Sequence, residues 1–530
     1  MAQTFSPVDI QTGAGSSNPE GFQQYNNLLY FSATDGIHGT ELWVSDGTQA
    51  GTQMVKDIWV GTGSSDVGDL TVFNNKLYFA ASDSVHGREL WVTDGTDTGT
   101  HMVYDLLTGT VSSNPNHLIV YNNKLFFNAN GPVVGNELFV TDGITESYLR
   151  DINPGSAGSN AGETGAVILN NLLIFSATDV AHGNELWVSD GTFGGTVLLA
   201  DIWPGTGSSF PGQVGFGPPY AVLNDLAFFQ AEDSLHGYQL WVTNGTTSGT
   251  QVVTNACTQP GYKGGFITFN NKVYFAANGN SDGNELWVSD STTAGTVLVK
   301  DINPGGNSSN PDNFFVYNNQ LLFAACAVGT GLSPQLFSTD GTSGGTRQLT
   351  NRSLAKNNGF NPLNMVELNG LVYFIGQDSL NGYQLFSTNG TDTNLVLLQP
   401  AIAPNNNPLS GMSGPYVFNN SLAFAANYTS IGNELWFYTP APSAISNVSS
   451  MGTLNIYPNP TTANITVAGL QDGQNYQLTL SDLQGRQLKQ FHLQGTGNPA
   501  TLFMQNMATG IYLLQIDNGQ FTQTRKVVKE

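Results

Sequence analysis

The chain contains few charged residues, and the imbalance between the two signs is large. Charged side chains make up 10% of the 530 residues, with 16 basic against 39 acidic, so the formal net charge is −23 at neutral pH. A surface of this sign repels phosphate groups, which argues against binding to nucleic acid or to anionic lipid through bulk charge. It allows a cationic or metal-bridged partner.

Cysteines and long apolar segments are also scarce. The two cysteines, Cys257 and Cys326, fall in different predicted sheets, so we expect two free, buried thiols and no disulfide. No run of about 20 apolar residues occurs, so we expect no membrane span. Residues 1–4 carry no charged-then-apolar leader, so for an exported protein we expect the leader to have been removed from this numbering.

Recognisable catalytic motifs are absent. The chain has no nucleophile elbow, no His-Glu-x-x-His, no P-loop and no dinucleotide fingerprint. No unique Asp/Glu pair stands out that would supply the two carboxylates of a glycosidase. We therefore predict a protein that is not an enzyme and that has no cofactor.

A recurring Asp-x-x-His-Gly loop is the nearest approach to a metal site. His and Asp are both metal ligands, but one pair is only half a site, and the pairs belong to different repeats. We expect these side chains to cap hairpin turns, and we predict no metal site. The pairs are Asp35/His38, Asp83/His86, Asp179/His182 and Asp233/His236.

What the chain has in abundance is a repeat. A unit that begins with Asn recurs nine times at intervals of 46 to 54 residues, and a period in this range indicates one supersecondary unit stacked on its copies. Each unit holds four short stretches rich in Tyr, Phe, Trp, Val and Leu, with Asn-Asn and Asp-Gly turns between them. Four strands repeated radially form the blade of a β-propeller. The Asn residues are 26, 74, 122, 170, 224, 270, 318, 369 and 419.

The two ends of the repeat region complement each other. Residues 5–10 match the fourth strand of a repeat, whereas the ninth repeat ends at its third strand, residues 434–437, so we expect the strand at residues 8–10 to pair with that strand. We therefore expect an all-β, nine-repeat propeller over residues 1–437, closed by the N-terminal strand, which would leave no exposed sheet edge.

One aromatic residue holds the same place in every repeat, with Trp91 as an example. We expect this residue to be buried between blades, because aromatic side chains supply large buried area. Trp59 and Trp203 lie in inter-blade loops where sister loops have Asn153 and Asn303. Because they break the symmetry, Trp59 and Trp203 are the better candidates for ligand binding at the surface.

The period stops after Trp436. Residues 438–452 form a linker rich in Pro, Ser and Ala, and residues 453–530 hold short alternating strands that predict a small antiparallel β-sandwich. This segment resembles the C-terminal sorting domain of the type IX (Por) secretion system of Bacteroidota. The residues that carry the resemblance include Tyr457, Pro458, Asn459, Pro460, Gly485, Gly510, Tyr512, Lys526 and Lys529.

The resemblance implies export to the periplasm, passage across the outer membrane through the type IX translocon, and a final place in the medium or on the outer cell surface. The repeats in turn resemble the Glu-Leu-Trp-x-x-Asp-Gly-Thr repeats of secreted bacterial proteins, which implies a propeller and no particular activity.

Three functions stay open from the sequence. The first is a non-enzymatic binding or adhesion module for a glycan or protein ligand, the second a self-associating subunit of an extracellular assembly, and the third a glycan-active hydrolase. Three Asp-Ser sequences also resemble the O-glycosylation motif of Bacteroidota, although Asp-Ser is equally a good turn. They place the candidate modified residues at Ser84, Ser234 and Ser379.

Overall fold

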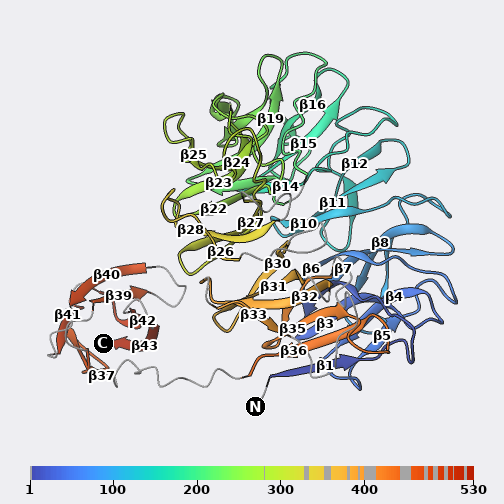
Figure 1. Cartoon of the computed structure of the whole chain (residues 1–530). Helices are drawn as coiled ribbons and strands as arrows, with labels where there is room; N and C mark the ends of the chain where they lie inside the picture. The colour runs from blue at the N-terminus through green and yellow to red at the C-terminus, as the bar shows by residue number, and fades with distance from the viewer. Residues whose placement is uncertain are drawn as a thin grey trace. The chain divides into compact units, whose positions relative to one another are not determined.

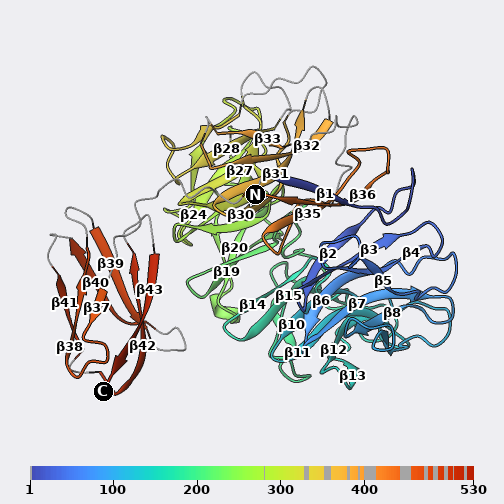
Figure 2. The same cartoon turned by 90° about the horizontal axis from the view of Figure 1, so that it is seen from below.

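A computed structural model describes most of the chain, and it divides into two compact units, residues 1–442 and 443–530. We describe each unit by itself (Figures 1 and 2). Residues outside the described part are 1–2, 216, 280, 328–333, 351–359, 379–381, 392–393, 399–412, 442–454, 471–474, 482–486, 495–498, 505–506 and 518–521.

The first unit is all-β apart from one short 3-10 helix, η1 (Thr247–Gly249), and its described residues form nine four-stranded antiparallel sheets. Sheets one to three are β2 (Glu20–Tyr25), β3 (Leu28–Thr34), β4 (Thr40–Ser45) and β5 (Gln53–Lys56); β6 (Gly68–Phe73), β7 (Lys76–Asp83), β8 (Gly87–Thr93) and β9 (His101–Tyr104); β10 (Asn116–Tyr121), β11 (Lys124–Gly131), β12 (Gly135–Thr141) and β13 (Glu146–Tyr148).

Sheets four to six are β14 (Ala166–Leu169), β15 (Leu172–Asp179), β16 (Gly183–Ser189) and β17 (Val197–Ala200); β18 (Tyr220–Leu223), β19 (Leu226–Asp233), β20 (Gly237–Thr243) and β21 (Gln251–Thr254); β22 (Phe266–Phe269), β23 (Lys272–Asn278), β24 (Asn284–Ser289) and β25 (Val297–Lys300). Sheets seven to nine are β26 (Asp312–Tyr317), β27 (Gln320–Ala325), β28 (Gln335–Thr339) and β29 (Arg347–Gln348); β30 (Leu363–Leu368), β31 (Leu371–Asp378), β32 (Gly382–Thr388) and β33 (Val396–Leu398); β34 (Tyr416–Phe418), β35 (Ser421–Ala426), β36 (Glu434–Thr439) and β1 (Thr4–Val8).

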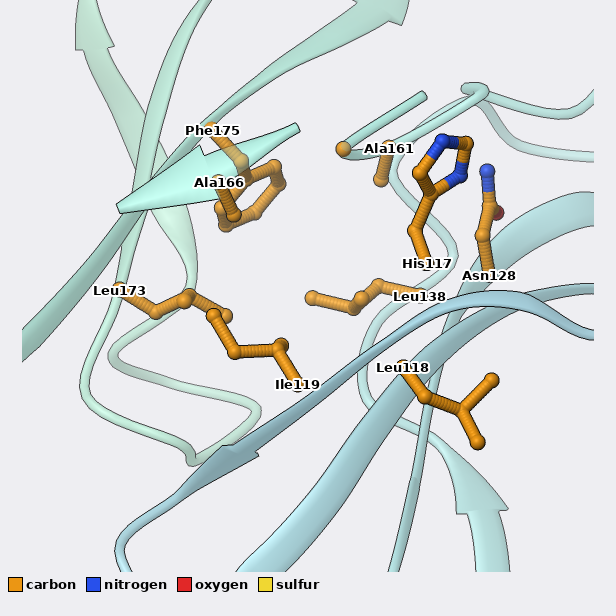
Figure 3. Close-up of a pocket in the computed structure, with 10 residues that line it drawn as sticks. His117, Leu118, Ile119, Asn128, Leu138, Ala161, Ala166, Leu173 and Phe175 are labelled. Carbon is orange, nitrogen blue, oxygen red and sulfur yellow. The ribbon is translucent and has the colours of Figure 1, made fainter. Parts of the chain in front are cut away.

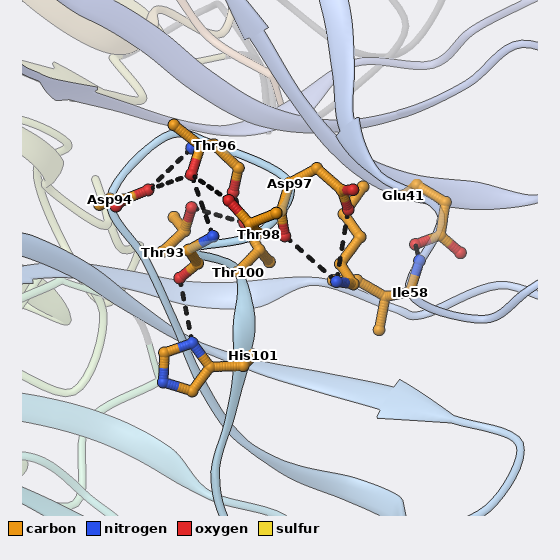
Figure 4. Close-up of polar contacts among 11 residues, drawn as sticks. Glu41, Ile58, Thr93, Asp94, Thr96, Asp97, Thr98, Thr100 and His101 are labelled. Atoms are coloured by element: carbon orange, nitrogen blue, oxygen red, sulfur yellow. Dashed lines mark hydrogen bonds and ion pairs between the residues drawn. The ribbon is translucent and has the colours of Figure 1, made fainter.

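Two kinds of turn make each sheet. The Asn-Asn turn between the first two strands has both residues at positive φ, 47° at Asn74 and 54° at Asn75, which suits a two-residue hairpin. The Asp-Gly-Thr turn is held by side chains (Figure 4). Asp94 Oδ1 accepts from the backbone N–H of Thr96 at 2.9 Å and from its hydroxyl at 2.7 Å, and Thr96 Oγ1 accepts from the N–H of Gly99 at 3.0 Å.

The core of this unit lies between the sheets. Nine clusters of buried apolar side chains each join two sheets, and one of them joins sheet nine to sheet one through Leu435, Phe437, Phe31 and Trp43. The first strands of several neighbouring sheets contact one another, as β2 does with β6, and we call the first strands of the nine sheets the inner strands. Trp91 is 6% exposed and packs between sheets one and two, at the buried place predicted for the repeated aromatic. Sheets packed face to face in this way form a β-propeller.

The ninth sheet draws its fourth strand from the other end of the chain. β1 runs antiparallel to β36, with Thr4 opposite Thr439 and Val8 opposite Leu435. Figure 1 shows blue β1 alongside orange β36. The strand lies nearer the N-terminus than the predicted residues 8–10, because Ile10 donates its N–H to Glu434 instead of continuing the ladder. The predicted end of the propeller at residue 437 falls inside β36, which continues to Thr439 because Thr4 and Phe5 still pair there.

The second unit is a small two-sheet structure. β37 (Asn455–Tyr457), β38 (Asn464–Ala468) and β41 (Ala500–Phe503) form one sheet, and β40 (Gln487–Gln494), β39 (Asn475–Ser481), β42 (Gly510–Asp517) and β43 (Thr522–Lys529) form the other. Buried Ile465, Leu478, Leu514 and Ile516 belong to the core between them. The sequence predicted neither β37 nor β41, which are short and have little alternation of their own.

Both cysteines are buried and free, as predicted. Burial raises the pKa of the Cys257 thiol to about 12 and that of Cys326 to about 11, so neither is a reactive thiolate near neutral pH. A search of the described residues for a helix long and apolar enough to cross a membrane finds none.

Candidate binding site on the inner strands

The Asp-x-x-His loops form closed hairpin turns. Asp83 Oδ1 accepts from the backbone N–H groups of Val85 and His86 at 2.9 and 2.6 Å, and His86 Nδ1 lies 2.8 Å from Asp83 Oδ2. The side-chain hydrogen bond to Asp83 raises the pKa of His86 above its usual value. Within the part of the chain that the structure describes, no group of three or more His, Cys, Asp or Glu residues is placed to hold a metal ion.

Trp59 and Trp203 are half-buried, and each covers its own loop. A Cβ added at Gly63 would lie 2.1 Å from the Trp59 indole, and one at Gly207 would lie 2.2 Å from the Trp203 indole, so each ring rests against a glycine four residues later. In a sister loop an amide contacts its own loop in place of the indole, since Asn153 Nδ2 donates to the carbonyl of Gly158 at 2.8 Å. The two tryptophans remain surface candidates with one ring face committed to the loop.

The candidate modification sites lie on exposed turns. Ser84 and Ser234 are exposed between the second and third strands of sheets two and five. Ser379 falls outside the described residues.

The sorting-motif residues gather around the last strand of the second unit. Asn459 accepts at Oδ1 from the N–H of Val528 at 2.8 Å and donates from Nδ2 to the carbonyl of Lys526 at 2.7 Å. Lys529 is nearly buried and donates from Nζ to the carbonyl of Thr462 at 2.6 Å. Tyr512 donates its hydroxyl to the carbonyl of Ala508. The start of the motif and the basic end of the chain are thus fastened together; Gly485 lies outside the described residues.

A set of buried glutamates was not predicted from the sequence. The Glu of each Glu-Leu-Trp is fully buried and holds the loop that leads to the next sheet. Glu285, for example, accepts from the N–H groups of Ile302 and Ser309 at 2.9 and 2.8 Å and from the Ser309 hydroxyl at 2.6 Å. Burial raises the pKa of Glu285 to about 7 against the pull of these hydrogen bonds. The signal was present, because Gln239, Gln335 and Gln384 stand at the same place in the three repeats without Glu.

A mainly apolar hollow with a few polar side chains lies across the inner strands. Its volume is about 630 Å³, and residues of sheets five to eight line it, with Phe266, Asp312, Asn313, Phe314 and Asn364 among them. Small-molecule sites usually have volumes of about 300–1,000 Å³, so this inner-strand pocket has the size of one. β-Bulges position its amides, since Asn313 and Asn364 sit at register shifts in β26 and β30 with φ of 52° and 53°.

The wall of the inner-strand pocket depends on glycine. A Cβ at Gly264 would lie 2.8 Å from Phe314 Cε2 and 2.9 Å from Asp312 Cα, so only glycine lets the segment before β22 approach β26 this closely. Burial raises the pKa of Asp312 to about 6, although the hydrogen bond from Asn313 and the charge of Lys263 act in the opposite direction.

A neighbouring hollow of about 330 Å³ shares Asn364 and Met365 with the first, and Phe22 and Tyr416 line it from sheets one and nine. The two hollows therefore continue along the inner strands on either side of Asn364. Sequence reasoning did not find this region because its residues come from several repeats. The sequence feature that could have indicated it is the start of the inner strands, where Pro, Gly and Asn interrupt the apolar residues of the strand.

Comparison with known proteins identifies the second unit. Residues 455–530 match the family model described as the secretion system C-terminal sorting domain. This unit is an export signal. The protein leaves the cell by type IX secretion and reaches the cell surface or the extracellular space, as the sequence resemblance predicted. No curated protein sequence matches the chain.

Solved structures similar to this chain include three with low sequence identity. Puromycin hydrolase is 12% identical with a TM-score of 0.35, covering 70% of this chain and 60% of its own, so the chain spans about three fifths of that enzyme. BamB from Moraxella catarrhalis is 10% identical with a TM-score of 0.37, covering 83% of this chain and 97% of its own. The β-propeller domain of the trilobed protease from Pyrococcus furiosus is 10% identical with a TM-score of 0.33, covering 74% of this chain and 100% of its own.

Proposed function

We propose that this secreted protein is a non-enzymatic binding module whose nine sheets close into one ring, and that it binds a glycan in the inner-strand pocket. The same pocket would serve attachment to a glycan-bearing surface, because the sorting domain delivers the propeller outside the cell. The observation that carries the proposal is the combination of aromatic and amide side chains in one pocket on the inner strands.

Contacts between the two chain ends support closure. Glu434 accepts from the N–H of Ile10 and of Ser17, both at 2.9 Å, and from the Ser17 hydroxyl at 2.6 Å. The backbone N–H of Gln24 in β2 donates to the Tyr416 hydroxyl in β34 at 3.0 Å. Sheet nine therefore touches sheet one through both backbone and side-chain groups, which suits a ring that leaves no sheet edge exposed.

The chemistry of the pocket suits a neutral polyol. Phe314 and Phe315 supply apolar faces against which a sugar ring packs, and the amides of Asn313 and Asn364 each offer donors and an acceptor for hydroxyl groups. Asp312 adds one acceptor. An apolar pocket with a few convergent polar groups is the usual form of a specific small-molecule site.

The non-enzymatic part of the proposal rests on the carboxyl groups. Glycosidases need two carboxyl groups on opposite sides of the scissile bond. Among the described residues that line the inner-strand pocket, Asp312 is the one carboxyl group. Its pKa is raised to about 6, but a single carboxyl group does not supply both the acid and the second carboxylate that a glycosidase needs.

A glycan array probed with the intact protein tests the proposal, with Asn364→Ala as the pocket variant. Asp69→Ala is a matched control, because Asp69 occupies the equivalent bulge of β6, at φ of 56°, outside the pocket, so both variants carry the same backbone strain. We expect Asn364→Ala to lose its array signal and Asp69→Ala to keep it.

Equal signals from the two variants would refute binding at this pocket. An absence of array signal together with sedimentation as a polymer would favour a structural subunit instead. Turnover of a polysaccharide panel would refute the non-enzymatic assignment.

A further inference from the structure

One inner-strand packing residue is missing from sheet four. In the sister sheets the residue that faces the central Phe of the second strand is larger than alanine, and where it is aromatic its ring packs on that Phe, as in Phe22–Phe31 at 5.8 Å and Phe266–Phe275 at 5.6 Å between ring centroids. Sheet four has Ala166 opposite Phe175. The residues in the other eight sheets are Phe22, Leu70, Leu118, Tyr220, Phe266, Phe314, Met365 and Pro415.

Because Ala166 is small, a separate cavity lies beside it. A hollow of about 220 Å³ lies between sheets three and four, and its lining is mainly apolar, with Ile119, Leu138, Leu173 and Phe175. Figure 3 shows Phe175 and Ala166 on one side of this cavity, and His117 and Asn128 on the other. An apolar cavity of about 150 Å³ already accepts a benzene ring, so this one has room for a somewhat larger group. We call it the sheet-four cavity.

A buried amide lines the sheet-four cavity. Asn128 is 2% exposed, and within the described part of the chain its Oδ1 has no hydrogen-bond partner. The equivalent residue is Ser, Ala or Ile in seven repeats. The one other amide, Gln230, donates to the carbonyl of Gln213 at 2.6 Å, although within the described residues its own Oε1, like Asn128 Oδ1, has no hydrogen-bond partner. An unpaired buried acceptor costs about 1–3 kcal/mol, so Asn128 is a costly residue here unless something bonds to it.

His117 is a third residue that departs from the repeat pattern, and it lines the same cavity as Ala166 and Asn128. His117 occupies the bulge of β10 at φ of 53°, where the bulges of other inner strands have Gly21, Asp69, Asn313 and Asn364. A left-handed conformation is less common for His than for Gly, Asn or Asp. The exposed imidazole is held by its Nδ1, 2.9 Å from Asn116 Oδ1, and it lies close to Asn128 in Figure 3. His117 therefore places an imidazole beside the cavity where the sister strands place Gly, Asp or Asn.

We propose that the sheet-four cavity binds the acetamido group of an N-acetylated sugar. The methyl group would pack on Phe175 and Leu173, in the space that Ala166 leaves open. The amide N–H would donate to Asn128 Oδ1, which the broad torsion of the Asn side chain turns toward the cavity. The sugar ring would stay at the mouth beside His117. No Asp, Glu, Lys or Arg is among the lining residues, which suits an uncharged group.

This cavity and its ligand do not depend on the inner-strand pocket, because the two share no lining residue. The experiment uses the intact protein and two probes, the methyl glycosides of N-acetylglucosamine and of glucose. Binding is measured by calorimetry, and saturation-transfer NMR reports which protons of the probe touch the protein. We expect saturable binding of the N-acetylated probe only, with the strongest transfer to its acetyl methyl group.

Two variants test the placement. Ala166→Phe restores the side chain that stands at 266 and 314 and should abolish binding, and Asn128→Ala, which copies the residue at 80, should raise the Kd by about tenfold, as expected for one lost hydrogen bond. Asp69→Ala, at a residue that lines neither cavity, is the control and should bind the probe as the unchanged protein does. Melting temperatures verify that each variant is folded.

Failure of the unchanged protein to bind the N-acetylated probe, or equal binding of the two probes, would overturn the proposal. Full binding by folded Ala166→Phe would overturn it as well.

Discussion

Replacing Glu285 with Gln should change how the stability of the propeller depends on pH. The Glu285 side chain is fully buried and its pKa is raised from 4.5 to about 7 because burial penalises the charged form. The folded protein therefore holds a proton between these two values that the unfolded chain has already released. The free energy of unfolding must fall as pH rises through this window and become constant above it.

The size of the effect follows from the shift. One pKa unit is worth about 1.4 kcal/mol, so a rise of this size sets an upper limit of ~3 kcal/mol for Glu285, and local relaxation would leave about 1–3 kcal/mol. Glu41, Glu137 and Glu185 have the same raised pKa of about 7. As pH rises, each of these carboxyl groups should therefore lower the stability of the unchanged protein over the same range as Glu285. Glu285→Gln removes one of these contributions. Gln fits the place, since Gln335 accepts there from the Thr350 hydroxyl at 2.9 Å.

Urea unfolding followed by tryptophan fluorescence, at about pH 5 and about pH 8, measures the difference. We expect Glu285→Gln to be less stable than the unchanged protein at the lower pH and to recover by about 1–3 kcal/mol relative to it at the higher pH. Glu163→Gln, on an exposed turn, is the control and should follow the unchanged protein at both values. If Glu285→Gln shows the same pH dependence as the unchanged protein, the buried carboxyl is not protonated in the fold and the argument fails.

Four further outcomes follow. Deleting residues 1–10 should remove β1 from β36 and lower the melting temperature sharply, and an unchanged value would contradict closure of the ring. Removing residues 454–530 should leave the protein in the periplasm, which cell fractionation detects; normal secretion would count against the sorting role. Trp91→Ala should cost about 3–5 kcal/mol in urea melts and Trp59→Ala far less, whereas equal costs would defeat the distinction between buried and loop tryptophans. Mass spectrometry of protein from its native host should find a hexose-scale addition on Ser84, Ser234 or Ser379, and all three serines bare would end the glycosylation hypothesis.

The repeat itself was legible in the sequence because its signals are local. Asn-Asn and Asp-Gly favour turns through their backbone conformation, and alternating aromatic and β-branched residues favour strands. The sheet of each repeat can therefore be predicted from the sequence of that repeat alone. The sorting domain was equally legible, since its motif residues run in a fixed order along one segment. The same local logic explains the small errors at β1 and β36, where the partner strand at the other end of the chain decides which residues pair.

The candidate sites were decided only by tertiary structure. The inner-strand pocket depends on Gly264, which lets the segment before β22 approach β26 closely, and on bulges in β26 and β30 at Asn313 and Asn364, which both line it. The sheet-four cavity requires Ala166 and Asn128 to face each other from different repeats. Sequence specifies each side chain and the conformation of its own turn. The side chains that share a cavity come from sheets that are dozens of residues apart in the sequence. Which of them meet depends on packing between the sheets, and no local sequence pattern predicts this packing.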